Sequence, residues 1–319
     1  MLAEFEEHVK ECFPELLRQR LLLACSAGID STVLAHIFAS LQLDFRLAHA
    51  NFNLRGAESR ADREFVEELA RKLKVKCYVK NFDTKSYVDK NKVSVQMAAR
   101  ELRYGWFREL LASGEADLLV TAHHADDVLE TFLINLSRGT GLDGLSGIPA
   151  RSGAIRRPLL PFGREQLAAF AQDRCLAWRE DRTNAEWEYL RNRFRHGVVP
   201  ALKEACPDIL ERLGRTQENL RESRDLIDRY ISAIRSEVSR DEGDIIRFDA
   251  AALRELKPLK AHLFELFRAY GFTDWRAVAA LLEGETGREV LSATHRLLCD
   301  RGSLLLKPVE PLEMDRYQV

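Results

Sequence analysis

The sequence has 319 residues, a length that suits one large domain or two ordinary domains with a sizeable core. Charged residues make up 31% and hydrophobic residues 46%, and the formal net charge of −2 gives no global sign of a nucleic-acid partner. Since no apolar run approaches the roughly 20 residues of a membrane span, and residues 1–20 lack the apolar core of a secretory signal, we expect a cytoplasmic protein with no membrane partner.

Short apolar runs alternate with helical patterns along the first half of the chain. The runs are typical of buried strands and lie at residues 20–25, 44–48, 75–79 and 117–122. The helical patterns lie at residues 30–41, 57–73, 93–111 and 125–138. This alternation predicts an α/β fold with a doubly wound parallel sheet. Ligand-binding groups in such a fold gather at the carboxyl ends of the strands, here near residues 25, 49 and 122.

The pattern changes after Pro200. Residues 207–238 keep a helical spacing of apolar positions among many charges, which predicts one long helix or two. Further helices are expected at residues 259–270 and 274–282, followed by a hairpin within residues 289–307. We therefore expect residues 1–206 to form one domain and residues 207–319 to form a smaller, mainly helical domain.

The stretch "SAGIDS", residues 26–31, lies between the first predicted strand and the first predicted helix. It lacks the lysine of a Walker loop, but two serine hydroxyls and the backbone N–H groups of residues 28–31 can still hold a pyrophosphate. Asp30 would repel a bare anion, so we expect it to face a divalent ion that bridges the phosphates. The alternative is an ordinary capped helix with Ser26 or Asp30 at its N-cap.

Two other positions are candidates for contact with a nucleotide. His49 ends the second predicted strand, although a histidine that is satisfied by neighbouring backbone is an equal alternative. Arg100 and Arg103 lie one turn apart on a predicted helix, and we choose Arg100 to neutralise charge on a transferring α-phosphate. The alternative for Arg100 is a solvated helix face.

The stretch "TAHHADDVLETFL", residues 121–133, follows the fourth predicted strand. On a helix, His123, Asp127 and Glu130 fall at positions i, i+4 and i+7 and share one face. They could bind a metal, act as a base or hold a cationic substrate. A structural acidic turn at a helix N-terminus also explains Asp126 and Asp127.

The phosphate loop resembles the SGGxDS loop of the PP-loop, or N-type, ATP pyrophosphatases, whose fold is adenine nucleotide alpha hydrolase-like. Ala27 stands where that family usually has glycine, and we predict that it keeps a negative φ with a free N–H. With "RGTGLDGLSGIPA", "IRRPLLPFGREQL" and "WREDRTNAEWEYLRNRFRHGVVPAL", the chain is similar to the tRNA(Ile)-lysidine synthetases from residue 20 to about residue 202. After residue 207 the resemblance is looser.

The resemblance implies a ligase that uses ATP and Mg²⁺. ATP adenylylates C2 of the wobble cytidine of tRNA(Ile) with a CAU anticodon and releases pyrophosphate. Free L-lysine then displaces AMP and forms lysidine. The partners implied are this tRNA and free lysine, and the resemblance leaves a homodimer open.

The resemblance also implies residue roles. ATP binding is expected at Ala24, Ser26, Ala27, Gly28, Ile29, Asp30, Ser31, His49 and Arg100, with Asp30 also holding the metal. Catalysis is expected at Asp30, Arg100, His123 and Asp127. Asp127 and Glu130 would bind the ammonium group of lysine. Contact with tRNA is expected at Arg182, Arg191, Asn192, Arg193 and Arg195, where basic and aromatic residues alternate; the alternative is a salt-bridged connection between domains.

Three rival functions follow from the same loop. One of them, an amide-forming ligase of the same superfamily, gives no reason for the basic run at residues 191–196. A tRNA 2-thiolase would use the same adenylylation, but none of the six cysteines forms a CxxC pair. A nucleotide-binding regulator without catalysis is favoured by Ala27 and by Phe52 and Asn53, which stand where relatives of the chain often have a second histidine.

Overall fold

The computed structural model describes residues 1–180 and 190–309. Contacts divide the chain into two units, Met1–Leu220 and Arg221–Val319. The division falls inside helix α11 (Ile209–Val238), which is one continuous helix where the sequence left one or two open. We placed the domain boundary near residue 206, just before this helix begins.

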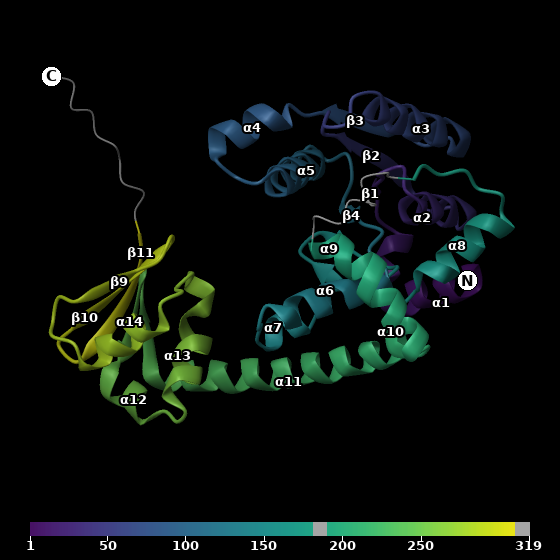
Figure 1. The fold of residues 1–319 in the computed structure, drawn as a ribbon. Helices are drawn as coiled ribbons and strands as arrows, with labels where there is room; N and C mark the ends of the chain where they lie inside the picture. The colour runs from purple at the N-terminus through teal and green to yellow at the C-terminus, as the bar shows by residue number, and fades with distance from the viewer. Residues whose placement is uncertain (181–189, 310–319) are drawn as a thin grey trace, which may run out of the picture. The chain divides into compact units, whose positions relative to one another are not determined.

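The first unit contains a sheet of mostly parallel strands (Figure 1). The strand order is β3-β2-β1-β4-β6-β5, and only β5 is antiparallel to its neighbour. The strands are β1 (Leu21–Ala24), β2 (Phe45–Asn51), β3 (Cys77–Asn81), β4 (Leu118–Val120), β5 (Arg151–Ser152) and β6 (Ile155–Arg156). The predicted parallel sheet is therefore confirmed, and its first four strands are those that the apolar runs indicate.

The helices of the first unit also follow the sequence pattern. The four predicted helices are α2 (Ile29–Ser40), α3 (Ala57–Leu73), α5 (Val95–Ala112) and α6 (Ala125–Ser137). Further helical segments are α1 (Leu2–Cys12), η1 (Pro14–Leu17), α4 (Thr84–Asn91), α7 (Leu142–Leu145), α8 (Arg164–Asp173), α9 (Leu190–Arg193), η3 (Phe194–Val198) and α10 (Val199–Ala205).

Helices cover both faces of this sheet. Leu21 and Leu23 of β1 belong to a core that includes side chains of α1, α2 and α8, whereas Leu22 packs with Trp106 and Phe107 of α5. Successive strand residues therefore enter opposite cores, which is why β1 reads as a continuous apolar run rather than an alternating one. Each fully buried leucine stabilises the fold by about 1.5–3 kcal/mol.

The second unit contains a sheet beside its helices, of which the sequence analysis predicted only one hairpin. It contains a five-stranded antiparallel sheet in the order β7-β8-β11-β10-β9. The strands are β7 (Ser239–Glu242), β8 (Ile245–Asp249), β9 (Glu289–Leu291), β10 (His295–Asp300) and β11 (Ser303–Pro308). Its helical segments are α12 (Ala250–Glu255), α13 (Leu259–Phe267), η4 (Arg268–Tyr270), α14 (Trp275–Ala280) and η5 (Leu281–Glu283). The edge strands β7 and β9 are largely exposed and lack a buried face, so their sequences carry no clear alternation.

The predicted hairpin is confirmed as β10 and β11. Asp300 pairs with Ser303 across its turn. The two central residues have positive φ, 42° at Arg301 and 81° at Gly302, as tight hairpin turns of this handedness require.

Candidate active site

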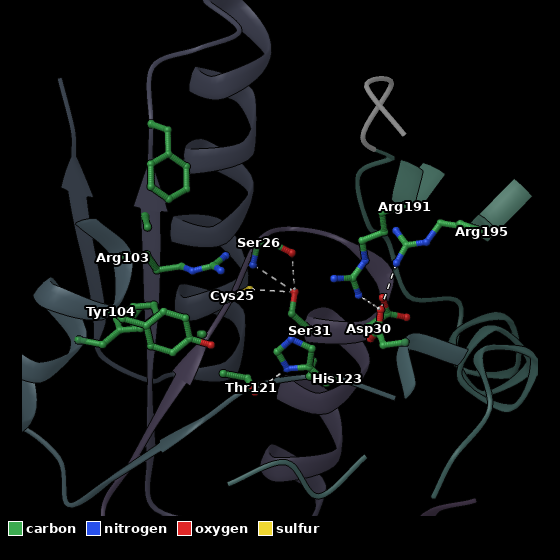
Figure 2. Close-up of a pocket in the computed structure, with 17 residues that line it drawn as sticks. Cys25, Ser26, Asp30, Ser31, Arg103, Tyr104, Thr121, His123, Arg191 and Arg195 are labelled. Carbon is green, nitrogen blue, oxygen red and sulfur yellow. Dashed lines mark hydrogen bonds and ion pairs between the residues drawn. The ribbon is translucent and has the colours of Figure 1, made fainter. Parts of the chain in front are cut away.

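A cavity of about 400 Å³ opens at the carboxyl ends of β1, β2 and β4, where the topology of the sheet predicts a ligand site (Figure 2). The residues that line it are Ala24, Cys25, Ser26, Asp30, Ser31, Ala48, Ala50, Phe52, Arg103, Tyr104, Phe107, Thr121, Ala122, His123, Asp127, Arg191 and Arg195. A cavity of this size suits a small ligand such as a nucleotide.

The phosphate loop joins β1 to α2 at one side of this cavity. The hydroxyl of Ser31 donates a hydrogen bond to the carbonyl oxygen of Gly28 at 3.1 Å and accepts one from the amide of Ser26 at 3.2 Å. These bonds curl the loop around the start of the helix. The first intrahelical bond runs from the amide of Thr32 to the carbonyl oxygen of Gly28 at 3.1 Å, so the amides of residues 29–31 have no intrahelical acceptor and can face an anion. The amide of Gly28 donates to the hydroxyl of Ser26 at 3.4 Å.

Ala27 does not have the negative φ that we predicted. Its φ is 71°, a left-handed conformation that glycine adopts readily and alanine does at a cost of about 1–2 kcal/mol. The side chain is 1% exposed and belongs to the apolar core, so its methyl group does not crowd the cavity. That its N–H is free stays a prediction. An alanine therefore adopts a left-handed backbone conformation that favours glycine.

The two carboxylate oxygens of Asp30 differ in their contacts: one lies near a histidine and the other has no hydrogen-bond partner in the described residues. Oδ2 lies 3.6 Å from Nε2 of His124. Oδ1 is buried and has no hydrogen-bond partner within residues 1–180 and 190–309. In those same residues no group of three or more histidine, cysteine or acidic side chains could hold a metal. One orphaned carboxylate oxygen beside a phosphate-binding loop fits Mg²⁺, which takes one or two carboxylates and completes its shell with phosphates and water.

The two histidines of the "AHHADD" stretch occupy different places. We expected His123 to share a helical face with Asp127 and Glu130. Helix α6 begins only at Ala125, so His123 precedes the helix and does not share that face. It still lines the cavity, and its Nδ1 lies 2.8 Å from the hydroxyl of Thr121. Burial lowers the pKa of His123 to about 4, so the ring is neutral at pH 7 and can accept a proton.

His124, which the sequence analysis did not select, lies among three carboxylates. Its ring nitrogens are 3.5 Å from Asp127, 3.6 Å from Asp30 and 3.7 Å from Asp126. Burial opposes a charge on this ring, but the three carboxylates outweigh burial and raise its pKa. His124 thus links the phosphate loop to the acidic turn of α6. The only sequence signal for it was its position in the doubled histidine.

Asp127 and Glu130 lie on one face of α6, as expected, but they are ion-paired within the chain. Arg191 lies 3.2 Å from Asp127 and 3.1 Å from Glu130. Arg195 lies 3.0 Å from Asp127 and 2.6 Å from Glu130. Burial opposes ionisation of Asp127, but His124, His123 and the two arginines together lower its pKa. These residues, expected to contact lysine and tRNA, therefore contact one another.

The other side of the cavity is formed by α5 and β2. Figure 2 shows Arg103 and Tyr104 across the cavity from Arg191 and Arg195. Burial lowers the pKa of Arg103, and no carboxylate partner for it is found in the described part of the chain. An uncompensated guanidinium at a cavity is suited to an anionic ligand. Ala48, Ala50 and Phe52 provide small and flat apolar surface next to it.

Some predicted residues do not reach the cavity. Arg100 is exposed, with its guanidinium 5.0 Å from the centroid of the Tyr104 ring. His49 is buried and its Nδ1 lies 2.9 Å from the carbonyl oxygen of Cys25, which is the alternative arrangement that we considered. Asn192 and Arg193 lie on α9 and are not among the lining residues. Arg182 lies outside the described residues.

Comparison with known proteins identifies two matching families and several relatives. Residues 1–202 match a family described as "PP-loop domain" and residues 241–309 one described as "TilS substrate binding domain". The tRNA(Ile)-lysidine synthase of Bacteroides thetaiotaomicron is 37% identical over 92% of this chain and 68% of its own length. That of Porphyromonas gingivalis W83 is 38% identical over 91% of this chain and 64% of its own length. The chain spans about two thirds of the length of these curated relatives.

A solved structure supports the fold. The U34-tRNA thiolase NcsA from Methanococcus maripaludis, with its [4Fe-4S] cluster, superposes with a TM-score of 0.57 over 69% of this chain and 80% of its own. Its sequence identity is 15%, so the likeness concerns the fold alone. In residues 1–180 and 190–309, no helix is long and apolar enough to cross a membrane.

Proposed function

Because the chain belongs to the tRNA(Ile)-lysidine synthase family, we propose that it ligates free L-lysine to C2 of the wobble cytidine of tRNA(Ile) with a CAU anticodon. ATP is converted to AMP and pyrophosphate, and the tRNA is adenylylated in between. The observation that carries the proposal is that the phosphate loop and the acidic residue Asp127 open into the same cavity. This supports the proposal, because a phosphate site and a site for an ammonium group would then be neighbours.

In the first step, the C2 carbonyl oxygen of the cytidine attacks the α-phosphorus of ATP and pyrophosphate leaves. The amides at the start of α2 and the hydroxyls of Ser26 and Ser31 bind the phosphates, and Asp30 would hold Mg²⁺ through its unengaged oxygen. When bound, the metal neutralises charge on the leaving pyrophosphate. Arg103 supplies a further positive charge from the opposite side of the cavity.

In the second step, the ε-amine of lysine attacks C2 and AMP leaves. The amine must be neutral to attack, although its usual pKa is about 10.4, so the ammonium needs a carboxylate to bind it and a base to take its proton. Asp127 and Glu130 bind the ammonium. His123 and Asp127 both line the cavity near the proton transfer; because the pKa of His123 is about 4, its ring takes the proton only if the bound substrates raise that pKa.

A cytidine in an unpaired anticodon loop can leave its stack at low cost and enter such a cavity. The positive side chains for tRNA phosphates are those of α9 and η3, Arg191, Arg193 and Arg195. The cytoplasmic location and a homodimeric state stay predictions, and sedimentation of the purified chain tests the second.

Pyrophosphate release tests the proposed function. Purified protein is given ATP and Mg²⁺ alone, then with tRNA(Ile) transcript carrying a CAU anticodon, then with the same transcript in which the wobble cytidine is replaced by uridine. We expect release only with the cytidine transcript, and net turnover only when lysine is added. Release that ignores tRNA would contradict the proposal and favour another ligase, and no release under any condition would favour a non-catalytic nucleotide-binding protein.

A further inference from the structure

The two carboxylates proposed to bind lysine are fully engaged by groups of the same chain. For Asp127, Oδ1 contacts both arginines and Oδ2 accepts a hydrogen bond from the amide of His124 at 3.1 Å. For Glu130, Oε1 accepts from Nε of Arg195 at 2.6 Å and Oε2 accepts from Nε of Arg191 at 3.1 Å. All four carboxylate oxygens therefore have a partner within the chain, so an ammonium group would have to displace the guanidiniums or share the oxygens with them.

Glu130 is closed off from the cavity, whereas Asp127 lines it but is mostly covered. The side chain of Glu130 is 2% exposed and that of Asp127 is 11% exposed, and the arginines cover both. Glu130 does not line the cavity, whereas Arg191 and Arg195 do. The guanidinium groups thus hold the place that the ammonium group of the substrate requires, and lysine can reach Glu130 only after they move.

The segment that carries the arginines has little apolar anchoring. Neither α9 nor η3 contains a buried residue, and the exposed fractions of Leu190 and Val198 are 38% and 43%. The ion pairs with α6 therefore supply much of the attachment of this segment. Segments with few buried contacts open at low free energy, and a competing ligand for the arginines can release them.

We propose that Arg191 and Arg195 form a latch that keeps lysine out of its site until the phosphates of a bound tRNA draw the two guanidiniums away from Asp127 and Glu130. This inference rests on the proposed function and concerns its regulation. Arginine binds phosphate in the same two-pronged geometry in which it binds carboxylate. The side chain of Arg191 is already 48% exposed, so a phosphate can reach it before its present ion pairs are broken.

The exchange leaves the two carboxylates with one positive charge in place of two, and the ring of His124, 3.5 Å from Asp127, offsets part of the difference. Two guanidiniums leave two carboxylates for tRNA phosphates, and the ammonium group of lysine takes over the carboxylates. The latch also has a functional consequence, because lysine would enter only after the tRNA whose cytidine it must attack. An ordered requirement of this kind prevents lysine from reacting with other adenylylated species in the cavity.

The first test measures lysine affinity of the full chain by equilibrium dialysis with labelled lysine, without ATP. The wild-type protein is compared with and without a saturating anticodon stem-loop of tRNA(Ile). Coupled sites typically change each other's affinity by about 5–150-fold, and we expect lysine to bind at least about tenfold more tightly when the RNA is present. Because coupling is reciprocal, lysine must tighten RNA binding by the same factor. Equal lysine affinity with and without RNA overturns the latch.

The second test removes the latch. In the double variant Arg191→Gln with Arg195→Gln, we expect lysine to bind without RNA at least about tenfold more tightly than it binds to wild type, while RNA affinity falls. Lys203→Met is the matched control, since it removes a cation from the neighbouring Asp126 and leaves Asp127 and Glu130 untouched; its lysine affinity should equal that of wild type. If the double variant binds lysine as weakly as wild type, or more weakly, the arginines are not a latch.

The outcomes separate this inference from the proposed function. If the variant binds no more lysine but wild type still forms lysidine, only the latch fails. If wild type forms no lysidine, the proposed function itself fails. A variant that does not fold is recognised by its thermal unfolding, and the comparison of wild type with and without RNA then decides the matter by itself.

Discussion

The backbone amide of Arg179 donates a hydrogen bond to the carbonyl oxygen of Ala27 at 3.0 Å. The side chain of Arg179 is in turn held by Asp62 and Glu58 of α3, each at 2.6 Å. The phosphate loop is therefore held by residues outside the loop at Ala27, the residue with the left-handed backbone conformation. This attachment helps an alanine to keep a conformation that favours glycine.

Ala27→Gly should change stability little. Glycine relieves a left-handed strain of about 1–2 kcal/mol, but it loses a buried methyl group worth about 0.8 kcal/mol and raises the entropy of the unfolded chain. We expect the free energy of unfolding in urea to stay within about 1 kcal/mol of wild type, with pyrophosphate release retained. The matched control is Ala35→Gly in α2, which loses a fully buried methyl group without relief of strain. Equal destabilisation by the two changes would show that Ala27 is not strained.

Arg103→Met and Arg100→Met compare two arginines of α5. Arg103 faces the cavity and its charge is disfavoured by burial, so its loss should leave stability unchanged or raise it by up to about 1 kcal/mol. The same loss should slow pyrophosphate release by about a hundredfold, as when one charge-stabilising group is removed from an active site. If Arg100→Met slows pyrophosphate release more than Arg103→Met does, then Arg100 and not Arg103 neutralises charge on the transferring phosphate.

Asp30→Asn tests the metal site. The change keeps the shape of the side chain and removes the charge that Mg²⁺ requires. We expect pyrophosphate release to fall by about a hundredfold or more while the affinity for tRNA is nearly unchanged, since the latter comes chiefly from phosphate contacts. Full release at elevated Mg²⁺ would indicate a supporting role only, and full release at ordinary Mg²⁺ would remove Asp30 from the site.

The free energy of unfolding should fall in acid because the buried ring of His123 is neutral in the folded state. Its pKa is about 4 in the folded state and about 6.5 in the unfolded state, so the unfolded state binds the proton first as the pH falls. Stability is therefore lost between about pH 6.5 and pH 4. His123→Gln should lose less stability than wild type between pH 7 and pH 5 in urea titrations. Parallel losses in the two proteins would show that the ring is not held neutral by burial.

Glu130→Gln tests the lysine site. Gln keeps the size of the side chain but removes the charge that attracts the ammonium group, so we expect the lysine concentration for half-maximal ligation to rise at least about tenfold. Adenylylation, followed as pyrophosphate release with tRNA and without lysine, should be intact. If the first step is lost instead, Glu130 serves adenylylation and not lysine binding.

Local patterns predicted the sheet and the phosphate loop. The apolar strands and the "SAGIDS" turn act over a few residues, so their places can be derived from the sequence alone. The φ of Ala27 could not be predicted, because it depends on a hydrogen bond from Arg179, far along the chain. Sequence spacing also could not show which of Arg100 and Arg103 faces the cavity. The packing of Trp106 and Phe107 in the core sets the rotation of α5 about its axis.

The other differences between the sequence-based predictions and the structure arise from contacts between residues that lie far apart in the sequence. The acidic face of α6 was predictable from the i, i+3 spacing of Asp127 and Glu130, but their partners Arg191 and Arg195 lie on a distant segment. His124 caps α6, so the helix begins too late to include His123. The exposed edge strands of the second unit, β7 and β9, are stabilised by backbone pairing with β8 and β10. Their own sequences show no alternation of polar and apolar residues that would predict a strand.

The most direct test of the central claim is mass spectrometry of the wobble nucleoside. A tRNA(Ile) transcript with a CAU anticodon is incubated with the purified chain, ATP, Mg²⁺ and L-lysine, and is then digested to nucleosides. We predict that cytidine at the wobble position is replaced by lysidine, and that omission of either ATP or lysine prevents this. An unmodified cytidine in the complete reaction, from protein that binds both ATP and the transcript, would contradict the account.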